Sequence, residues 1–283
     1  MSSIADNTKA IMNRHDFTAS KRFGQNFLRD VSVLEDIIKA SGISEDDIAV
    51  EIGPGLGTLT EFLSNACARV YAIEVDKKLI PILRETLSGR DNIEIINADI
   101  MKTDLSAVTG GKPFRIVANL PYYITTPVIM SIFESQTLCR SVTVMVQKEV
   151  GERITAKPGS KNYGALTLAA AYHSKACIVR KVPSGCFVPA PKVDSVVVHM
   201  EVYEDKPVQA RDEKLLFDLI RGAFNQRRKT LVNALLGYAG IGFGKEELLG
   251  SITALGLKPT VRGEELSLEQ FAALADILTR DRE

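Results

Sequence analysis

Three glycines at alternate positions follow an apolar run near residue 50. The stretch 50–60 reads VEIGPGLGTLT, in which a β-branched run ends at Gly53, Gly55 and Gly57 before a helical pattern begins. Glycines at such a turn let the chain bend sharply and let a ligand approach the main chain. A tight strand-to-helix turn without a ligand would carry the same glycines, so the loop indicates binding only together with its neighbours.

Two acidic residues mark the ends of the next two apolar runs. Glu74 closes VYAIE, and Asp99 follows IEIINA. A carboxylate at the first position can accept both hydroxyls of a ribose, and an acid at the second can accept a hydrogen bond from the amino group of adenine. Either residue alone could be a surface charge. Together, at successive strand ends, they predict a site for adenosine.

The glycine spacing favours an adenosine ligand without a pyrophosphate. Where the dinucleotide fingerprint G-x-G-x-x-G has its third glycine, this chain has Thr58. No pattern suited to hydride transfer is present either. We therefore expect S-adenosylmethionine as the cofactor. No metal is expected, because the four cysteines stand far apart and no histidines cluster.

The fourth apolar run leads into Asn119-Leu120-Pro121-Tyr122. The asparagine amide and the Leu120 carbonyl, fixed by the following proline, offer two acceptors for an NH₂ group that must be held and made more nucleophilic. Tyr122 offers a face on which a planar base can stack. A turn with a capping asparagine and a core tyrosine is the alternative. No general base is needed, since orientation and electrostatics suffice for an amine facing a strong methyl donor.

Strand and helix patterns alternate through the first two thirds of the chain. The predicted strands are 48–52, 70–75, 93–97, 115–118, 142–146, 178–182 and 195–200, and helices between them include 33–40, 59–66 and 77–87. This alternation predicts an α/β fold with a doubly wound sheet.

The last third of the chain shows helical patterns and no strand run. The predicted helices are 212–224, 229–239, 245–254 and 268–278, and Ser267 with Gln270 forms a capping box for the last. A polar segment, YEDKPVQAR (203–211), separates the two regions. We predict a catalytic domain of residues 1–205 and a smaller all-α domain of residues 206–283.

Composition and charge exclude several classes of protein. The 283 residues are 45% hydrophobic and 25% charged, which predicts a folded chain. No apolar run reaches the roughly 18 residues of a membrane span, and no signal peptide pattern opens the chain. We expect a cytoplasmic protein without membrane association. Residues 31–104 hold 7 basic and 14 acidic residues, whereas 140–192 hold 9 and 2. This segregation favours binding of a polyanion, although two differently solvated surfaces would also produce it.

Six motifs together resemble those of the ribosomal RNA small-subunit adenine dimethyltransferases. In order they are SKRFGQNFLRD (20–30), EIGPGLG (51–57), NLPY (119–122), QKEVG (147–151), FVPAPKVDS (187–195) and FNQRRKTL (224–231). The resemblance implies a Rossmann-like class I methyltransferase sheet with a helical rRNA-binding domain. It implies methyl transfer from S-adenosylmethionine to N6 of two adjacent adenosines in a hairpin near the 3′ end of 16S rRNA, within the pre-30S subunit. We expect a monomer.

The resemblance also implies roles for single residues. Asn26 and Leu28 would close over the methionine end of the cofactor, and Gly53 with Gly55 would contact it. Asn119 would accept from the target amino group next to the cofactor, beside the Leu120 carbonyl. Tyr122 and Phe187 would stack on the two faces of the target adenine; a core anchor is the alternative for Phe187. The residues expected to contact RNA are Lys21, Arg22, Lys148, Arg153, Arg227, Arg228 and Lys229.

The segment FNQRRKTL is expected to begin a helix, whose N-terminus favours phosphate. A solvated helix face is the alternative for its three basic residues.

Two other functions are compatible with parts of this pattern. A large-subunit rRNA adenine methylase of the macrolide-resistance type shares the cofactor loop, NLPY and the FxPxP segment. The stretches KNYGALT (161–167), FNQRRKTL and VRGEELS (261–267) favour the small-subunit enzyme. An RNA-binding assembly or transcription factor on the same scaffold would need no chemistry, and the intact EIGPGLG, Glu74, Asp99 and NLPY argue against it.

Overall fold

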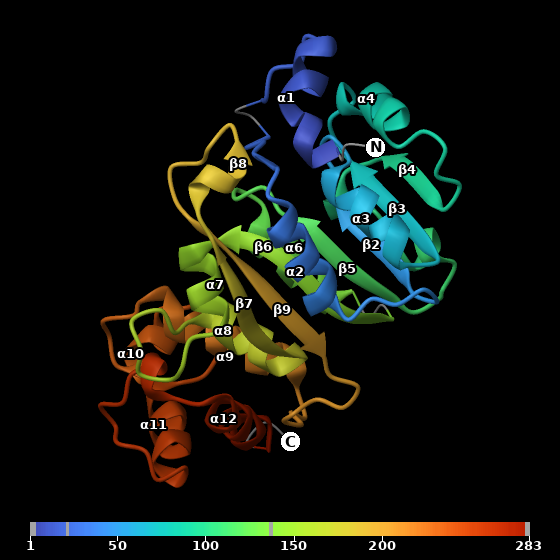
Figure 1. The fold of residues 1–283 in the computed structure, drawn as a ribbon. Helices are drawn as coiled ribbons and strands as arrows, with labels where there is room; N and C mark the ends of the chain where they lie inside the picture. Colours follow the sequence, from blue (N-terminus) through green and yellow to red (C-terminus); the bar gives the residue numbers. More distant parts are fainter. Residues whose placement is uncertain (1–3, 21–22, 136–137, 281–283) are drawn as a thin grey trace. The chain divides into compact units, whose positions relative to one another are not determined.

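The chain divides into two compact units, which we describe separately. The computed structural model describes residues 4–20, 23–135 and 138–280 (Figure 1). The first unit holds the described residues up to Gly151 and Ala176–Val202. The second holds Glu152–Lys175 and the described residues from Tyr203 onward. The chain enters the second unit for the last time at Tyr203, which is the first residue of the polar segment 203–211. Residues 152–175, which we expected in the first domain, group with the C-terminal helices instead.

A seven-stranded sheet forms the centre of the first unit. Its order is β4-β3-β2-β5-β6-β9-β7. The strands are β2 (Ile48–Ile52), β3 (Arg69–Glu74), β4 (Ile93–Asn97), β5 (Phe114–Asn119), β6 (Cys139–Gln147), β7 (Ser174–Val182) and β9 (Ser195–Val202). The first five of these in the sheet pair in parallel, and β9 runs antiparallel to β6. The predicted doubly wound α/β fold is confirmed.

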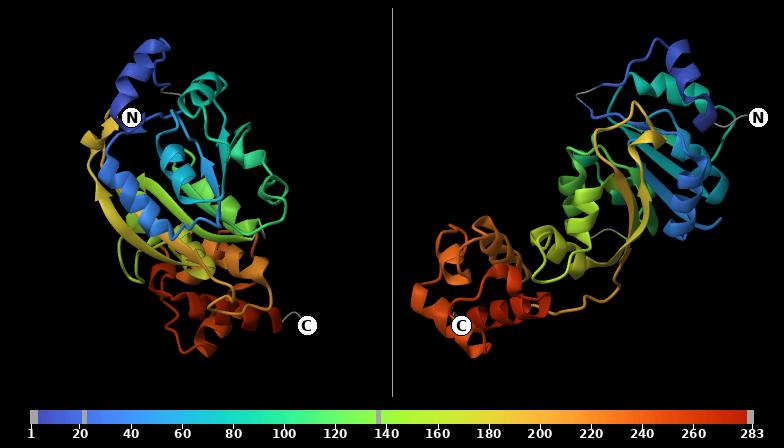
Figure 2. Two further views of the ribbon diagram at one scale, coloured as in Figure 1. Left: turned by 45° about the vertical axis from the view of Figure 1, so that its right-hand side comes forward. Right: turned by 60° about the vertical axis from the view of Figure 1, so that its left-hand side comes forward.

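Helices lie on both faces of this sheet (Figures 1 and 2). They are α1 (Ile4–Arg14), α2 (Val31–Ser41), α3 (Thr58–Ala66), α4 (Leu79–Thr86), α5 (Leu105–Thr109), α6 (Thr125–Glu134) and α7 (Lys148–Ile154). One core cluster packs α2 and α3 against the strands through side chains such as Leu34, Leu63 and Val117. The apolar faces of the predicted helices 33–40 and 59–66 are thus those that cover the sheet. A two-stranded ribbon, β1 (Phe27–Leu28) with β8 (Phe187–Val188), joins distant parts of the chain.

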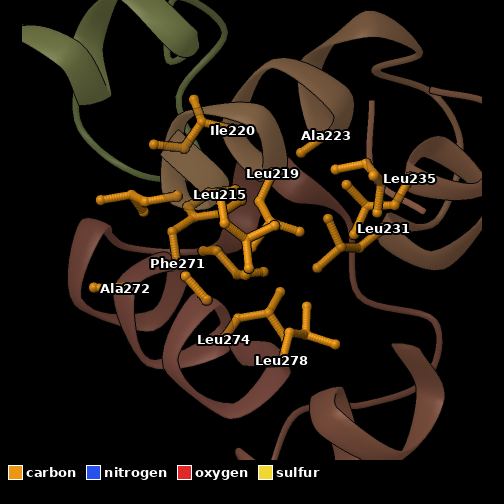
Figure 3. Close-up of a cluster of buried hydrophobic side chains, with 14 of the residues drawn as sticks. Leu215, Leu219, Ile220, Ala223, Leu231, Leu235, Phe271, Ala272, Leu274 and Leu278 are labelled. Atoms are coloured by element: carbon orange, nitrogen blue, oxygen red, sulfur yellow. The ribbon is translucent and has the colours of Figure 1, made fainter. Parts of the chain in front are cut away.

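The second unit is helical around its own core. Its helices are α8 (Ala165–His173), α9 (Glu213–Asn225), α10 (Leu231–Leu236), α11 (Lys245–Ala254) and α12 (Leu268–Arg280). Figure 3 shows leucines of α9, α10 and α12 converging around Phe271. The predicted capping box of α12 is present, since Ser267 N donates to Gln270 Oε1 at 2.9 Å and Gln270 N donates to Ser267 Oγ at 3.3 Å. None of the helices in the described ranges is long and apolar enough to cross a membrane.

The start of α7 packs closely on β9, which gives a first prediction. A Cβ on buried Gly151 would lie 2.2 Å from Val196 Cγ2 and 3.1 Å from Val198 Cγ2. Gly151→Ala should therefore lower the free energy of unfolding by about 1–3 kcal/mol through overpacking. Urea unfolding followed by circular dichroism measures this.

The exposed glycine of α11, Gly250, is the matched control, because a Cβ there meets nothing within 4 Å. Gly250→Ala should raise stability by roughly 0.5–1 kcal/mol through helix propensity. Equal effects of the two substitutions would contradict the packing seen at Gly151.

Candidate active site

A cavity of about 410 Å³ lies at the carboxyl ends of four parallel strands. Its walls come from the residues that follow β2, β3, β4 and β5, together with the segment 23–28. The strand order places the ends of β4, β3, β2 and β5 in a row. Asp99, Glu74, Gly53 and Asn119 therefore follow one another along this edge, as the sequence predicted for an open α/β sheet.

The glycine loop is shaped by a close contact with the N-terminal segment. Gly53 and Gly55 have φ of 68° and 63°, in the left-handed region that favours glycine. A Cβ on Gly55 would lie 2.9 Å from the Phe27 ring. Gly55 is therefore required both by its backbone conformation and by its contact with Phe27. Its backbone lines the cavity.

Glu74 is buried and tied to the N-terminal segment through a second acid. Its Oε1 accepts from Asp76 N at 2.8 Å, and its Oε2 accepts from Gly55 N at 3.3 Å. Asp76 Oδ2 in turn accepts from Gln25 Nε2 at 2.9 Å. Burial raises the pKa of Glu74, and the two backbone hydrogen bonds oppose that rise. Neither Gln25 nor Asp76 was predicted, because the spacing of the motifs carries no signal for this contact.

Asp99 lies beside two exposed apolar side chains. Its Oδ1 accepts from Met101 N at 3.0 Å, so the acid caps a short 3-10 turn, Ile100–Lys102. Val75 and Met101 line the same part of the cavity and are 44% and 43% exposed. This end of the cavity thus combines one acceptor with apolar walls, which suits a flat heterocycle.

Asn119 has its amide orientation fixed by the N-terminal segment. Its Nδ2 donates to the main-chain oxygen of Asn26 at 3.0 Å. Since the amide nitrogen faces a carbonyl, the Oδ1 atom is the one left to accept a hydrogen bond from a ligand. The neighbouring Leu120 is 1% exposed, and its N donates to Met145 O at 3.1 Å. The two expected acceptors therefore sit on a rigid strand end.

The tyrosines after Asn119 provide aromatic surface at the cavity. Tyr122 OH is 2.9 Å from Ser195 Oγ, which holds the ring in place. Burial raises the pKa of the Tyr122 phenol, so the phenol is neutral at physiological pH. Tyr123 also lines the cavity and is 55% exposed.

Glu51, the first residue of the EIGPGLG motif, is a further acid of the cavity for which the motif predicted no separate role. It lies on β2, lines the cavity and is 2% exposed. Its Oε2 has no hydrogen-bond partner among the described residues. Burial raises the pKa of Glu51 to about 8, the Thr60 hydroxyl lowers it in part, and the negative charge of Glu74 raises it further. In the ligand-free protein the cavity therefore contains a protonated carboxylic acid at neutral pH.

Phe187 lies outside the cavity lining. It is 3% exposed, belongs to the core cluster under α2, and pairs with Leu28 across the β1–β8 ribbon. A base could reach its ring only after this ribbon had moved. By contrast, Asn26, Leu28 and Gly55 all line the cavity as predicted for cofactor contacts.

The predicted basic residues differ in their availability. Lys21 and Arg22 lie outside the described residues. Lys148 at the start of α7 and Arg153 in its last turn are exposed, as are Arg228 and Lys229. Arg227 instead pairs with Glu264, with Nε and Oε2 3.1 Å apart.

The expectation that FNQRRKTL begins a helix is wrong. α9 runs to Asn225, Gln226 leaves the helical conformation, and α10 begins only at Leu231. The three basic residues therefore lie in the turn between the helices. The reason is that Phe224 packs on the core at the end of α9 and Leu231 packs on it at the start of α10, so the polar residues between them form the connection.

Known proteins resemble this chain over nearly its whole length. The family model described as ribosomal RNA adenine dimethylase matches residues 16–280. The chain belongs to this family. It is 51% identical over 276 residues to ribosomal RNA small subunit methyltransferase A of Lachnoclostridium phytofermentans, covering 96% of this chain and 95% of that one. It is 46% identical over 275 residues to the protein of the same name from Clostridium acetobutylicum, covering 97% and 99%.

Two solved structures of family-like enzymes share the fold. A dimethyladenosine transferase from Plasmodium falciparum is 28% identical with a TM-score of 0.75, covering 88% of this chain and 95% of that one. The 23S rRNA methyltransferase ErmE is 26% identical with a TM-score of 0.71, covering 90% and 100%. The expected class I methyltransferase fold is confirmed, and so is the resemblance on which it rested.

The raised pKa of Glu51 predicts a pH-dependent stability of the ligand-free protein. Between the ordinary carboxyl pKa of 4.5 and about 8, the folded state holds a proton that the unfolded state has lost. The free energy of unfolding therefore decreases as pH rises through this window, by up to about 1.4 kcal/mol per pH unit. Glu51→Gln removes this contribution. The Tm of the variant minus that of the wild type should therefore be larger at pH 8.5 than at pH 5.5. A difference in Tm that does not change with pH would contradict the protonated state.

Proposed function

We propose that this chain transfers methyl groups from S-adenosylmethionine to N6 of two adjacent adenosines in a hairpin near the 3′ end of 16S rRNA, in the pre-30S subunit. Family membership supports rRNA adenine dimethylation, and the relatives that cover nearly the whole chain are named for the small subunit. The observation that carries the proposal is the row of Asp99, Glu74, Gly53 and Asn119 along one edge of the sheet.

The cavity fits S-adenosylmethionine better than a phosphorylated cofactor. Three carboxyl groups line it, those of Glu51, Glu74 and Asp99, and its described lining includes no lysine, arginine or histidine. Such a surface repels phosphate and attracts a cation. When bound, S-adenosylmethionine supplies an electrophilic methyl group on a positively charged sulfur.

Each strand end would hold one part of this cofactor. Asp99 accepts from the adenine amino group between Val75 and Met101, and Glu74 accepts from the ribose hydroxyls. The backbone at Gly53 and Gly55 leaves room for the methionine part, over which Asn26 and Leu28 lie.

Asn119 and Leu120 then receive the target amine. The Oδ1 of Asn119 and the Leu120 carbonyl accept its two hydrogens, which turns the nitrogen lone pair toward the methyl group. The Asn26 carbonyl keeps the Asn119 amide in the required orientation. Stacking on Tyr122, at roughly 1–3 kcal/mol, offsets part of the cost of removing the base from its stack. The proton can leave to water after transfer.

The large-subunit reaction remains the competing function, because the similarity to ErmE extends over 90% of this chain. The deciding assay uses labelled S-adenosylmethionine with small subunits that lack the dimethyladenosines, with large subunits in parallel. We expect N6,N6-dimethyladenosine in the small subunit. Label confined to the large subunit would favour the ErmE-like reaction, and bound RNA without label would favour a non-catalytic factor.

Asn119→Ala is the inactive reference for that assay. Removing the acceptor should lower single-turnover methyl transfer by roughly 10²–10³, the usual effect of one electrostatic contact to a reacting group. RNA affinity should change by less than about twofold, since phosphate contacts dominate it. Asn13→Ala on the exposed side of α1 is the matched control and should keep full activity. An equal loss of RNA binding in Asn119→Ala would contradict the assigned role.

The exposed cations are proposed to bind rRNA phosphates. Arg228→Ala and Lys229→Ala should each weaken binding to small-subunit RNA and reduce the slope of log affinity against log salt by about one. Lys245→Ala at the exposed start of α11 is the control, with an unchanged slope expected. Arg227→Ala should mainly lower stability, because it breaks the ion pair with Glu264. Unchanged slopes for both Arg228 and Lys229 would exclude this turn from the RNA-binding surface.

A further inference from the structure

Glu51 differs from the other two carboxylates of the cavity. Glu74 accepts two backbone N–H groups, and Asp99 accepts one. Glu51 is the most deeply buried of the three, yet its Oε2 has no hydrogen-bond partner among the described residues. A buried carboxylate without partners is unfavourable unless it binds a proton or faces a cation. No group of three His, Cys, Asp or Glu side chains that could hold a metal ion occurs in the described ranges, so a metal is not the evident cation here.

The position of Glu51 in the sheet identifies which part of a ligand lies nearest. It stands on β2, opposite Ala72 of β3 and Val117 of β5. The proposed cofactor has its adenine at the end of β4 and its ribose at the end of β3, and the target amine lies at the end of β5. The atoms between ribose and amine must therefore pass over β2. In S-adenosylmethionine those atoms include the charged sulfur.

We propose that Glu51 is the counter-ion of the sulfonium: it holds a proton in the ligand-free cavity and releases that proton when the cationic cofactor binds. This inference rests on the proposed function, because it requires S-adenosylmethionine as the ligand. The acid loses its O–H bond, the proton goes to solvent, and the carboxylate remains ionised beside the positive sulfur. After methyl transfer the sulfur is neutral, so the carboxylate takes up a proton again.

The surroundings of Glu51 contain no cation, within the described lining, that could keep it ionised without the cofactor. The titratable groups that line the cavity with it are Glu74 from β3, Asp99 after β4, and Tyr122 and Tyr123 after β5. The Thr60 hydroxyl of α3 also interacts with it. The two acids can only raise its pKa, and the tyrosines and threonine carry no positive charge. The pKa of about 8 in the ligand-free cavity agrees with this arrangement.

Proton release would let the site distinguish cofactor from product. S-adenosylhomocysteine has the same adenosine, carboxylate and α-amino group but lacks the charge on sulfur. Without a positive charge on sulfur, Glu51 should keep its proton when S-adenosylhomocysteine binds. As pH rises and Glu51 loses its proton anyway, the affinity for S-adenosylmethionine should increase relative to that for S-adenosylhomocysteine.

Isothermal titration calorimetry of the full chain without RNA tests this. Both ligands are titrated in buffers of different ionisation enthalpy at pH 7 and pH 9. With a pKa of about 8, Glu51 should make S-adenosylmethionine release roughly 0.9 proton more than S-adenosylhomocysteine at pH 7 and about 0.1 more at pH 9. Glu51 should also shift the ratio of their Kd values roughly tenfold in favour of S-adenosylmethionine over that range. The sulfonium lowers the pKa of the α-amino group of S-adenosylmethionine as well, so the part of the difference that comes from the ligands is measured in Glu51→Gln and subtracted.

Two variants separate this role from a merely structural one. Glu51→Gln keeps the shape of the protonated acid but cannot titrate. Its difference in proton release between the two ligands should lack the contribution of Glu51, and should therefore be smaller than in the wild type by roughly 0.9 proton at pH 7 and about 0.1 at pH 9. Glu247→Gln is the matched control at the start of α11, where Glu247 Oε2 accepts from Gly244 N at 2.6 Å and a glutamine oxygen can do the same. It should behave as the wild type.

The outcomes that overturn the inference are distinct from failure of the proposed function. A difference in proton release between the two ligands that is the same in the wild type and in Glu51→Gln overturns the role of Glu51 as sulfonium counter-ion while leaving the methyltransferase assignment intact. Absence of any binding of S-adenosylmethionine refutes the proposed cofactor itself.

Discussion

The parallel pairing of β4, β3, β2 and β5 is the constraint on which the candidate site depends. Because these strands run in one direction, residues far apart in the sequence reach one edge of the sheet in a fixed order. That order matches the order of parts in the proposed cofactor and target: heterocycle at Asp99, ribose at Glu74, charged centre over β2 and reacting amine at Asn119. With strands about 4.8 Å apart, the sheet itself spaces the groups that must meet.

The N-terminal segment 23–28 forms the part of the cavity wall that the sheet does not provide. Gln25 binds Asp76 next to the ribose carboxylate, and the Asn26 carbonyl orients the Asn119 amide. The same short segment thus contacts both the cofactor end and the reacting end of the cavity. Its contact with Gly55 through Phe27 explains why the loop tolerates no side chain there. The proposed cofactor site and the orientation of the Asn119 amide therefore both depend on one piece of chain.

Sequence patterns predicted those parts of the site that depend on single strands. Glu74, Asp99 and Asn119 were found because each ends an apolar run, and the periodicity located the sheet and the α9, α11 and α12 helices. Contacts between distant segments could not be predicted from such patterns. Two examples are the hydrogen bonds of Gln25 with Asp76 and of Asn119 with Asn26, which join residues 51 and 93 positions apart. Glu51 opens the EIGPGLG motif, but no role was predicted for it, because only the folded sheet shows that its side chain lines the cavity. FNQRRKTL does not begin a helix because its apolar ends, Phe224 and Leu231, pack on the core from two different helices, which leaves the polar residues between them in the turn.

The separation of charge within the chain would favour entry of a base over a phosphate at the proposed site. The cavity carries only carboxylates among its described charged groups, whereas the exposed cations that we propose bind rRNA lie on α7 and in the turn between α9 and α10. A nucleic acid backbone can be held by the cations but is repelled by the cavity. The part of a nucleotide that can enter without this penalty is its uncharged base. The acids that suit a cationic methyl donor therefore also require the target adenine to leave its stack and enter the cavity alone.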